Sequence, residues 1–186
     1  EEFTWRRSNA HANVAAECAN TRDAVGLLEI SNYGKFEVTG PGAAEWLGTV
    51  MANKVPAIGR ITLSPMLNER GRLIGDFTMC RAAPDRFLLI GTWAAEVYYR
   101  RWFEQHPPPA GVTLRPLPDR ALLALQGPQA IAAIATLAPG IAALPFMGVG
   151  RFDIAGTEAL VSRSGYTGED GFEVITTREQ GVQLWE

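Results

Sequence analysis

The most restrictive feature of this 186-residue sequence is an internal repeat, in which a strand, a Gly-Pro pair, a helix and further strands follow one another twice. The first Gly-Pro pair lies in residues 38–41 (VTGP) and the second in residues 125–128 (LQGP). Proline is favoured in the first turn of a helix, so each pair predicts a helix that starts directly after a strand. An internal duplication of a β-α-β-β unit is the simplest explanation. Two unrelated helices that both begin with Gly-Pro are the alternative.

The repeat predicts an α+β fold made of duplicated β-α-β-β units. We place the first unit in residues 1–110 and the second in residues 111–186, because the prolines at 107–109 end a helix and are typical of a linker. A capping-box pattern at residues 177–180 begins a helix only about nine residues before the chain ends at Glu186. We therefore expect a fold that is truncated at its C-terminus.

Hydrophobic periodicity and turn residues predict the individual elements. Helices are expected over residues 9–23, 40–51, 93–103 and 127–137, and strands over residues 27–31, 35–39, 61–68, 72–81, 86–92, 121–125, 152–155, 159–163 and 172–175. The strands at 61–68 and 72–81 are expected to form a hairpin, because the turn residues 68–71 (NERG) separate them.

The charge balance and the scarcity of cysteine and histidine exclude several classes of function. With 17 basic and 20 acidic residues, the chain has a net charge of −3 and no basic excess for nucleic acid. No apolar stretch reaches membrane-spanning length, so we expect no membrane partner. Cys18, Cys80, His11 and His106 are too few and too far apart in sequence for a metal site or a disulfide framework. A reduced, cytoplasmic compartment is expected, and a matrix protein without its transit peptide is the alternative.

Asp76 is the first candidate for chemistry, because aspartate is disfavoured in the middle of a strand. Strand alternation predicts two faces, with Ile74, Asp76, Thr78 and Cys80 on one and Leu73, Gly75, Phe77 and Met79 on the other. Gly75, beside the acid, lets another group approach closely. The functional interpretation is a carboxylate that faces a pocket, where it holds a positive charge or takes a proton. The alternative is an edge-strand aspartate that faces water.

A glycine-dense loop at residues 164–174 (SGYTGEDGFEV) is the second candidate. Its glycines predict a tight loop that brings backbone and an aromatic ring against a planar ligand. A carboxylate accepts two parallel hydrogen bonds from a cyclic amide N–H and a neighbouring exocyclic amine, an edge that guanine-like and pterin rings present. An ordinary glycine-rich hairpin with solvated acids is the alternative.

Five segments together resemble the aminomethyltransferase (glycine cleavage T-protein) superfamily. They are residues 22–31 (RDAVGLLEIS), 35–41 (KFEVTGP), 66–71 (MLNERG), 125–128 (LQGP) and 165–173 (GYTGEDGFE), in the order of that family. Residues 33–36 (YGKF), and Thr78 with Arg81 after Asp76, are more similar to the folate-binding half of dimethylglycine and sarcosine dehydrogenases. The resemblance covers nearly the whole chain and implies the folate-binding fold of these enzymes.

This resemblance implies transfer of a one-carbon unit from an amine donor to tetrahydrofolate. Tetrahydrofolate is then the cofactor, and an amine-derived one-carbon donor is the other small-molecule partner. In the dehydrogenase branch a flavin half oxidises an N-methyl amine and the folate half captures the released carbon. A flavoprotein half, in the same or another chain, is therefore an implied partner.

The resemblance also implies roles for individual residues. Asp76 occupies the place of the family's key carboxylate, near the N10 side of folate, and is the expected catalytic residue. Glu173 occupies the place of the acid that grips the pterin edge. Tyr166 is expected to pack on the ring, and Met66 and Asn68 of the hairpin motif are expected to contact the cofactor.

Two departures from the family pattern keep other functions open. T-proteins usually carry a second acid where this chain has Gly75, which weakens a plain T-protein interpretation more than it weakens folate binding. The family also has a basic residue and a further barrel beyond the point where this chain stops, and folate binding is expected only if the natural protein contains them. The cysteine that iron–sulfur assembly relatives carry in the loop is absent from residues 164–166 (SGY), which argues against that branch. The alternatives are a folate-dependent demethylase of S- or O-methyl donors, a non-catalytic folate-binding module, and a core fragment that binds nothing.

Overall fold

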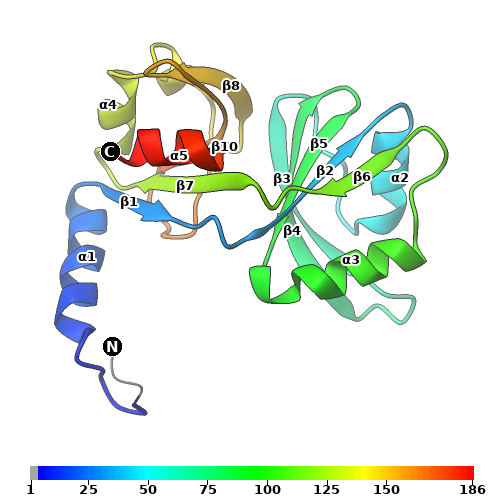
Figure 1. Ribbon diagram of the computed structural model, residues 1–186, viewed down its shortest axis with the longest axis horizontal. Coiled ribbons are helices and arrows are strands. Elements are labelled where there is room, and N and C mark those ends of the chain that lie inside the picture. Colours follow the sequence, from blue (N-terminus) through cyan, green and yellow to red (C-terminus); the bar gives the residue numbers. More distant parts are fainter. Residues whose placement is uncertain (1–3) are drawn as a thin grey trace.

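The computed structural model describes residues 4–186, which form two five-stranded antiparallel sheets with helices on their outer sides (Figure 1). In chain order the elements are α1 (His11–Asp23), β1 (Gly26–Glu29), β2 (Gly34–Thr39), α2 (Ala43–Val50), β3 (Arg60–Leu67), β4 (Leu73–Ala83), β5 (Arg86–Gly91), the 3-10 turn η1 (Trp93–Ala95), α3 (Glu96–Gln105), β6 (Thr113–Pro116), β7 (Arg120–Gln126), α4 (Ala130–Ala135), the 3-10 turn η2 (Ile141–Ala143), β8 (Val149–Ile154), β9 (Thr157–Ser162), β10 (Gly171–Thr177) and α5 (Arg178–Trp185). None of the helices in this part of the chain is long and apolar enough to span a membrane.

The predicted α+β fold with a duplicated unit is confirmed. The first sheet has the strand order β3-β4-β5-β2-β6, and the second has the order β8-β9-β10-β7-β1. The unit β2-α2-β3-β4-β5 therefore has the same order and pairing as the unit β7-α4-β8-β9-β10. Each repeat contains one strand more than the β-α-β-β unit that the sequence pattern predicts.

The two sheets exchange edge strands. β1, which precedes the first repeat, pairs antiparallel with β7 of the second sheet, and β6 pairs antiparallel with β2 of the first. Figure 1 shows the two connections, β1 to β2 and β6 to β7, crossing between the sheets. The boundary expected at residue 110 stays a prediction, and each sheet takes one strand from the other side of it. β6 was not predicted, because it has only four residues and ends in Pro116.

Each sheet buries residues on both faces, which gives the molecule three hydrophobic cores. The first core lies between the first sheet and helices α2 and α3, and the second lies mainly between the second sheet and α4 with η2. The third core lies between the sheets, where Ile61, Cys80, Leu88 and Ile90 of the first sheet meet Leu117, Leu122, Val149 and Ile175. This third core, called the interface core below, holds the two repeats face to face.

The helices at the two ends of the chain differ in how they pack. α1 forms as predicted, but none of its residues is buried, so its apolar positions do not contribute to a core. α5 begins at the predicted capping box, where the Thr177 hydroxyl accepts a hydrogen bond from the Gln180 backbone N–H at 3.2 Å. Close packing of α5 on β7 leaves no room for a side chain at Gly181, where an added Cβ would lie 2.4 Å from the Cβ of Ala121.

The hairpin of β3 and β4 forms as predicted, with one change of face near its turn. The pairing shifts register between Met66 and Leu67, so strict alternation stops before Gly75. Leu73 is consequently exposed and Ile74 packs on the first core, the reverse of the predicted faces. From Gly75 onward the predicted alternation is correct, and Asp76 lies on the opposite face from the buried Phe77.

The group that approaches Gly75 closely is a side chain of the protein itself. A Cβ placed at Gly75 would lie 2.3 Å from the Cε1 atom of Tyr99, whose ring is almost fully buried in the first core. The second acid of the usual T-protein pattern has no room in this packing. Tyr99 thus fixes the identity of the residue beside Asp76.

We expect Gly75→Ala to lower the free energy of unfolding by about 1–3 kcal/mol, because the added methyl group overpacks the Tyr99 ring. Gly48→Ala in α2 is the matched control, since its Cβ would meet only Val55 at 3.9 Å, and it is expected to raise stability by up to about 1 kcal/mol. Urea unfolding of both variants measures the difference. Equal effects would show that Gly75 is not constrained by Tyr99.

Candidate functional site

A cavity of about 640 Å³ opens at one end of the interface core, between the two repeats. Its apolar wall includes Ile61 and Ile90 of the interface core. Its polar wall comes from both repeats and includes Tyr33, Asp76, Thr78, Ser164, Tyr166 and Glu173. The structure therefore brings three of the five sequence-predicted site residues, Asp76, Tyr166 and Glu173, to one cavity.

Asp76 reaches the cavity because of strand alternation in β4. Asp76, Thr78 and Cys80 share the face that points toward the second sheet, and Cys80 at the far end of this row is fully buried in the interface core. Asp76 lies beyond the apolar part of the row and is exposed. Burial and the negative charge of Asp76 both raise the pKa of the Tyr99 hydroxyl.

Glu173 reaches the same cavity from β10, where it shares the inward face with Ile175 of the interface core. The Ser164 hydroxyl donates a hydrogen bond to its Oε2 atom at 3.0 Å, and the Ser162 hydroxyl lies 3.4 Å from the same oxygen. Burial raises the pKa of Glu173, and the two serines oppose this shift. The side chain is thus a buried carboxylate that, among residues 4–186, only two hydroxyl groups stabilise.

The second oxygen of Glu173 is open to the cavity. Within residues 4–186 no group donates a hydrogen bond to Oε1, since both serines contact Oε2. In that same part of the chain, every fully buried side-chain nitrogen or oxygen has a hydrogen-bond partner. Oε1 must therefore be accessible, and it is free to accept hydrogen bonds from a bound molecule.

The glycine-dense loop is held in place by the buried Gln126 at the end of β7. Its Nε2 atom donates hydrogen bonds to the carbonyl oxygens of Ser164 at 3.0 Å and Phe172 at 3.3 Å, one on each side of the loop. A Cβ at Gly165 would lie 1.9 Å from the Gln126 Oε1 atom, so the close approach requires glycine. An ion pair between Arg163 and Asp170 closes the base of the loop. The loop therefore presents Tyr166 and Ser164 from a fixed frame.

Tyr33 is a cavity residue that the sequence interpretation did not single out. Its ring stacks on Tyr166, with ring centroids 5.3 Å apart and planes inclined by 27°. Partial desolvation, the adjacent Tyr33 and the charges of Glu173 and Asp76 all raise the pKa of the Tyr166 hydroxyl. The only sequence signal was the position of Tyr33 in residues 33–36 (YGKF).

The buried Lys35 fixes the segment that carries Tyr33. Its Nζ atom donates hydrogen bonds of 2.7 Å to the carbonyl oxygens of Ser31 and Tyr33, which lie in the connection between β1 and β2. Burial lowers the pKa of Lys35, while the charge of Glu96 opposes the shift. Tyr33 is thus positioned by the same connection that links the two sheets.

Met66 and Asn68, the other two expected cofactor contacts, lie away from this cavity. Met66 is fully buried in the first core, because the register of β3 turns its side chain toward α2 and α3. The Asn68 side chain accepts hydrogen bonds from the backbone N–H groups of Arg70 and Arg72 at 2.9 and 3.0 Å, which closes the hairpin turn. Met66 thus packs in the first core and Asn68 closes the turn, and contact of either residue with a cofactor stays a prediction.

Three carboxylates line the cavity: Glu169 forms an ion pair with Arg22 at 3.5 Å, and Asp76 and Glu173 lie in different environments. Glu173 is buried, with one free acceptor oxygen, whereas Asp76 is solvated at the cavity wall. The described residues contain no group of three or more His, Cys, Asp or Glu side chains placed to hold a metal ion. The cavity is suited to a flat molecule that donates hydrogen bonds at one edge and carries or develops positive charge near the other acid.

Comparison with known proteins decides the family. The family model described as the GCVT N-terminal domain matches residues 1–186. The chain belongs to the GCVT N-terminal domain family. The resemblance seen in the sequence motifs is thereby confirmed at the level of the aminomethyltransferase superfamily.

The relatives of this GCVT N-terminal domain agree in sequence and in fold. An aminomethyltransferase of Thermotoga maritima is 30% identical over 186 residues, which cover 98% of this chain and 51% of the relative. The crystal structure of the glycine cleavage system aminomethyltransferase T from Bartonella henselae matches with a TM-score of 0.81 and 32% sequence identity. The matched region covers 92% of this chain and 47% of the Bartonella chain. The chain thus spans about half the length of the curated relatives it matches.

A more distant structure shares the fold alone. The heterotetrameric sarcosine oxidase from Corynebacterium sp. U-96 contains a chain with a TM-score of 0.62 and 18% identity, covering 98% of this chain and 93% of that chain. The arrangement of two sheets in this GCVT N-terminal domain therefore persists at low sequence identity.

We expect the stability of this GCVT N-terminal domain to depend on pH through Glu173. Burial raises the folded-state pKa of this carboxyl, so the folded chain keeps the proton to a higher pH than the unfolded chain does. The contribution of the Glu173 carboxyl to the free energy of unfolding is most favourable below its pKa in the unfolded chain. This contribution is lost as pH rises through its pKa in the folded chain. Glu173→Gln is therefore expected to be more stable than wild type near pH 7, by an amount on the order of 1 kcal/mol.

Urea unfolding between about pH 4 and pH 8 measures this effect, a range that brackets the ordinary carboxyl pKa. The two proteins should converge at the acid end of the range. Glu104→Gln on the exposed face of α3 is the control, and it should follow wild type throughout. Parallel curves for wild type and Glu173→Gln would contradict the burial argument.

Proposed function

We propose that the chain binds tetrahydrofolate in the cavity between the two repeats and takes part in transferring a one-carbon unit to it from an amine donor. The observation that supports this proposal is the meeting of Asp76 and Glu173, from opposite sheets, at a single cavity of about 640 Å³. That volume lies in the range of small-molecule sites. Membership of the GCVT N-terminal domain family supports the same assignment.

Glu173 is the residue that we expect to hold the pterin ring. The ring carries a cyclic amide N–H beside an exocyclic amine, and a carboxylate accepts both hydrogen bonds in parallel. Oε1 is open, and Oε2 contacts hydroxyl groups that can rotate. The ligand would also compensate the cost of burying this carboxylate, since it supplies the donors that the folded chain lacks.

Asp76 is the residue that we expect to act on the reacting nitrogen. A carboxylate there can accept the proton that a folate nitrogen loses when it forms its bond to the incoming carbon. Its negative charge can also stabilise a cationic, iminium-like form of the one-carbon unit. The exposure of Asp76 leaves it accessible to a donor that enters after folate.

The source of the carbon is part of the proposal, and membership of the family supports it. The donor is an amine-linked carbon, delivered directly as in an aminomethyltransferase or released by a flavoprotein half that oxidises an N-methyl amine. The fold shared with a chain of a sarcosine oxidase heterotetramer is compatible with the second route. Assays with S-methyl and O-methyl donors in place of amines separate both routes from a folate-dependent demethylase.

Tetrahydrofolate binding is expected to depend on Glu173. Isothermal titration with the 186-residue chain should show binding in the micromolar range, and Glu173→Gln should weaken it by about tenfold or more, because a charged hydrogen-bond pair is lost. Glu104→Gln on α3 should bind as wild type does. Unchanged affinity in Glu173→Gln would remove this residue from the site.

One-carbon chemistry is expected to depend on Asp76. Formaldehyde is the simplest one-carbon donor, since it condenses with the two folate nitrogens to give methylenetetrahydrofolate and water. Asp76→Asn should bind tetrahydrofolate with little change but form methylenetetrahydrofolate about 100-fold more slowly at saturation, because proton transfer is lost. A variant that turns over as fast as wild type would show that Asp76 is not catalytic.

A further inference from the structure

A second cavity, of about 300 Å³, lies at the opposite end of the interface core from the candidate folate site. Its floor includes Leu88, Leu117 and Ile175 of the interface core. Its charged wall consists of Arg86, Arg115, Arg120, Arg151, Glu37 and Glu158. This second cavity is called the arginine cavity below, and the proposed folate function makes no use of it.

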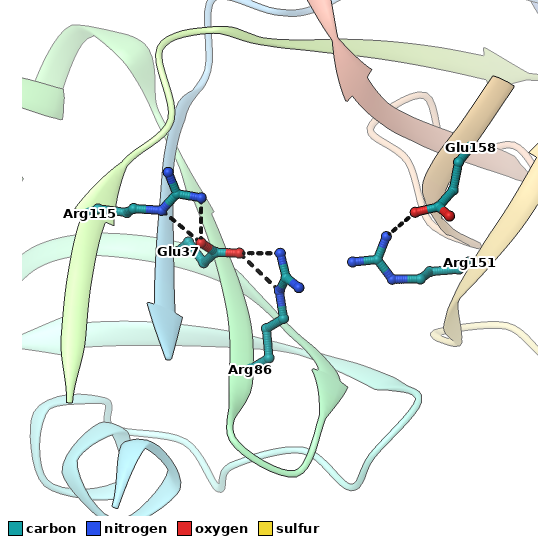
Figure 2. Close-up of polar contacts among 5 residues, drawn as sticks. All are labelled: Glu37, Arg86, Arg115, Arg151 and Glu158. Atoms are coloured by element: carbon teal, nitrogen blue, oxygen red, sulfur yellow. Dashed lines mark hydrogen bonds and ion pairs between the residues drawn. The ribbon is translucent and has the colours of Figure 1, made fainter. Parts of the chain in front are cut away.

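Glu37 on β2 is fully occupied by two of these arginines. Its Oε1 atom accepts hydrogen bonds from Arg86, with Nε at 2.9 Å and Nη2 at 2.7 Å, and its Oε2 atom accepts from Arg115, with Nε and Nη2 both at 2.8 Å (Figure 2). Burial opposes ionisation of Glu37, but the hydrogen bonds of Arg115 and Arg86 lower its pKa overall. The carboxylate is therefore ionised at neutral pH, and the two guanidinium groups around it carry one uncompensated positive charge.

The second sheet contributes two more guanidinium groups. Arg151 of β8 contacts Glu158 of β9 through a single ion pair, Nη1 to Oε1 at 2.6 Å, and the Glu158 side chain is 71% exposed. Figure 2 shows Arg151 extending from this side toward Arg86. The guanidinium group of Arg120, in β7, has no hydrogen-bond or ion-pair partner among residues 4–186. An exposed ion pair of this kind is weak, so Arg151 is available to a stronger partner.

The charges of the arginine cavity do not balance. Four guanidinium groups face two carboxylates, which leaves an excess of two positive charges in a chain whose net charge is −3. Like charges that converge on one cavity repel each other and gain from an anion placed between them. A network that served only to join strands would be expected to be neutral, whereas the Glu37 cluster alone already carries an excess of one positive charge.

We propose that the arginine cavity is a binding site for a small dianion of the phosphate type, either free phosphate or a phosphate monoester. Two negative charges match the excess of the lining. Guanidinium groups donate paired hydrogen bonds that fit the oxygen spacing of phosphate, and Arg120 and Arg151 have donors to spare. A volume of about 300 Å³ admits a phosphate group with a few attached atoms, and it is less than half that of the folate cavity. Both sheets contribute donors, so a bound anion would bridge the two repeats.

Isothermal titration of the 186-residue chain with inorganic phosphate, at constant ionic strength and slightly alkaline pH, tests this site. Arg120→Gln and Arg151→Gln should each weaken phosphate binding about tenfold, because each removes charged hydrogen bonds. Glu158→Gln should strengthen binding several-fold, because it releases Arg151 and removes a competing negative charge. Arg100→Gln on α3, which changes net charge equally but lies outside the cavity, should bind as wild type does.

Methyl phosphate, succinate and chloride complete the experiment. If methyl phosphate binds as tightly as phosphate, a phosphate monoester is an acceptable ligand. If phosphate binds and methyl phosphate does not, the ligand is the free ion. Either result supports the site. Equal responses to phosphate and chloride, or an equal loss in Arg100→Gln and Arg151→Gln, would reduce the effect to general screening and overturn the proposal. Tighter binding of succinate would overturn it in favour of a dicarboxylate. Tetrahydrofolate titration of the same arginine variants is the control for the folate cavity. Unchanged tetrahydrofolate affinity in these variants would show that a loss of phosphate binding concerns the arginine cavity alone.

Discussion

The contact between the two sheets is the interaction on which the rest of the structure depends. Each repeat has apolar residues on both faces of its sheet, and helices cover only the outer faces. The inner faces must therefore bury each other, and the interface core does this. The exchange of β1 and β6 holds the sheets in that position, because each repeat supplies a strand to its partner's sheet. Both cavities exist because the interface core is shorter than the sheets that form it.

The two ends of the interface core carry opposite charge. The inward faces of β4 and β10 continue beyond the apolar residues to Asp76 and Glu173 at one end. The inward face of β2 continues to Glu37 at the other end, where four arginines surround the cavity. In β4 and β10, a row of alternate residues runs from the interface core to an acid, whereas the inward face of β2 carries two buried charged residues, Lys35 and Glu37. The apolar core between the ends keeps the acidic and basic sites apart.

Much of the fold could be predicted from local sequence signals, whereas the site was predicted only in part. Gly-Pro pairs, alternation and the turn at residues 68–71 gave the repeat and nearly all strands, because these signals act over a few residues. Asp76, Tyr166 and Glu173 were proposed because each is unusual in its local pattern or matches a family motif, and all three line one cavity, while their roles stay predictions. Met66 belongs to a different family motif, at residues 66–71, but lies in the first core, since strand register decides its face. Tyr33 gave no distinctive local signal.

The sequence by itself determined the elements, the duplicated unit and the presence of two acidic segments, since propensity, periodicity and turn chemistry are local properties. Only the tertiary structure decided that β1 and β6 change sheets, that Tyr99 fills the space beside Gly75, and that the two acids share a cavity. It also decided that Glu37 meets Arg86 and Arg115, which are 49 and 78 residues away in sequence. These features depend on the packing of one sheet against the other, and no local pattern encodes the partner of a buried face.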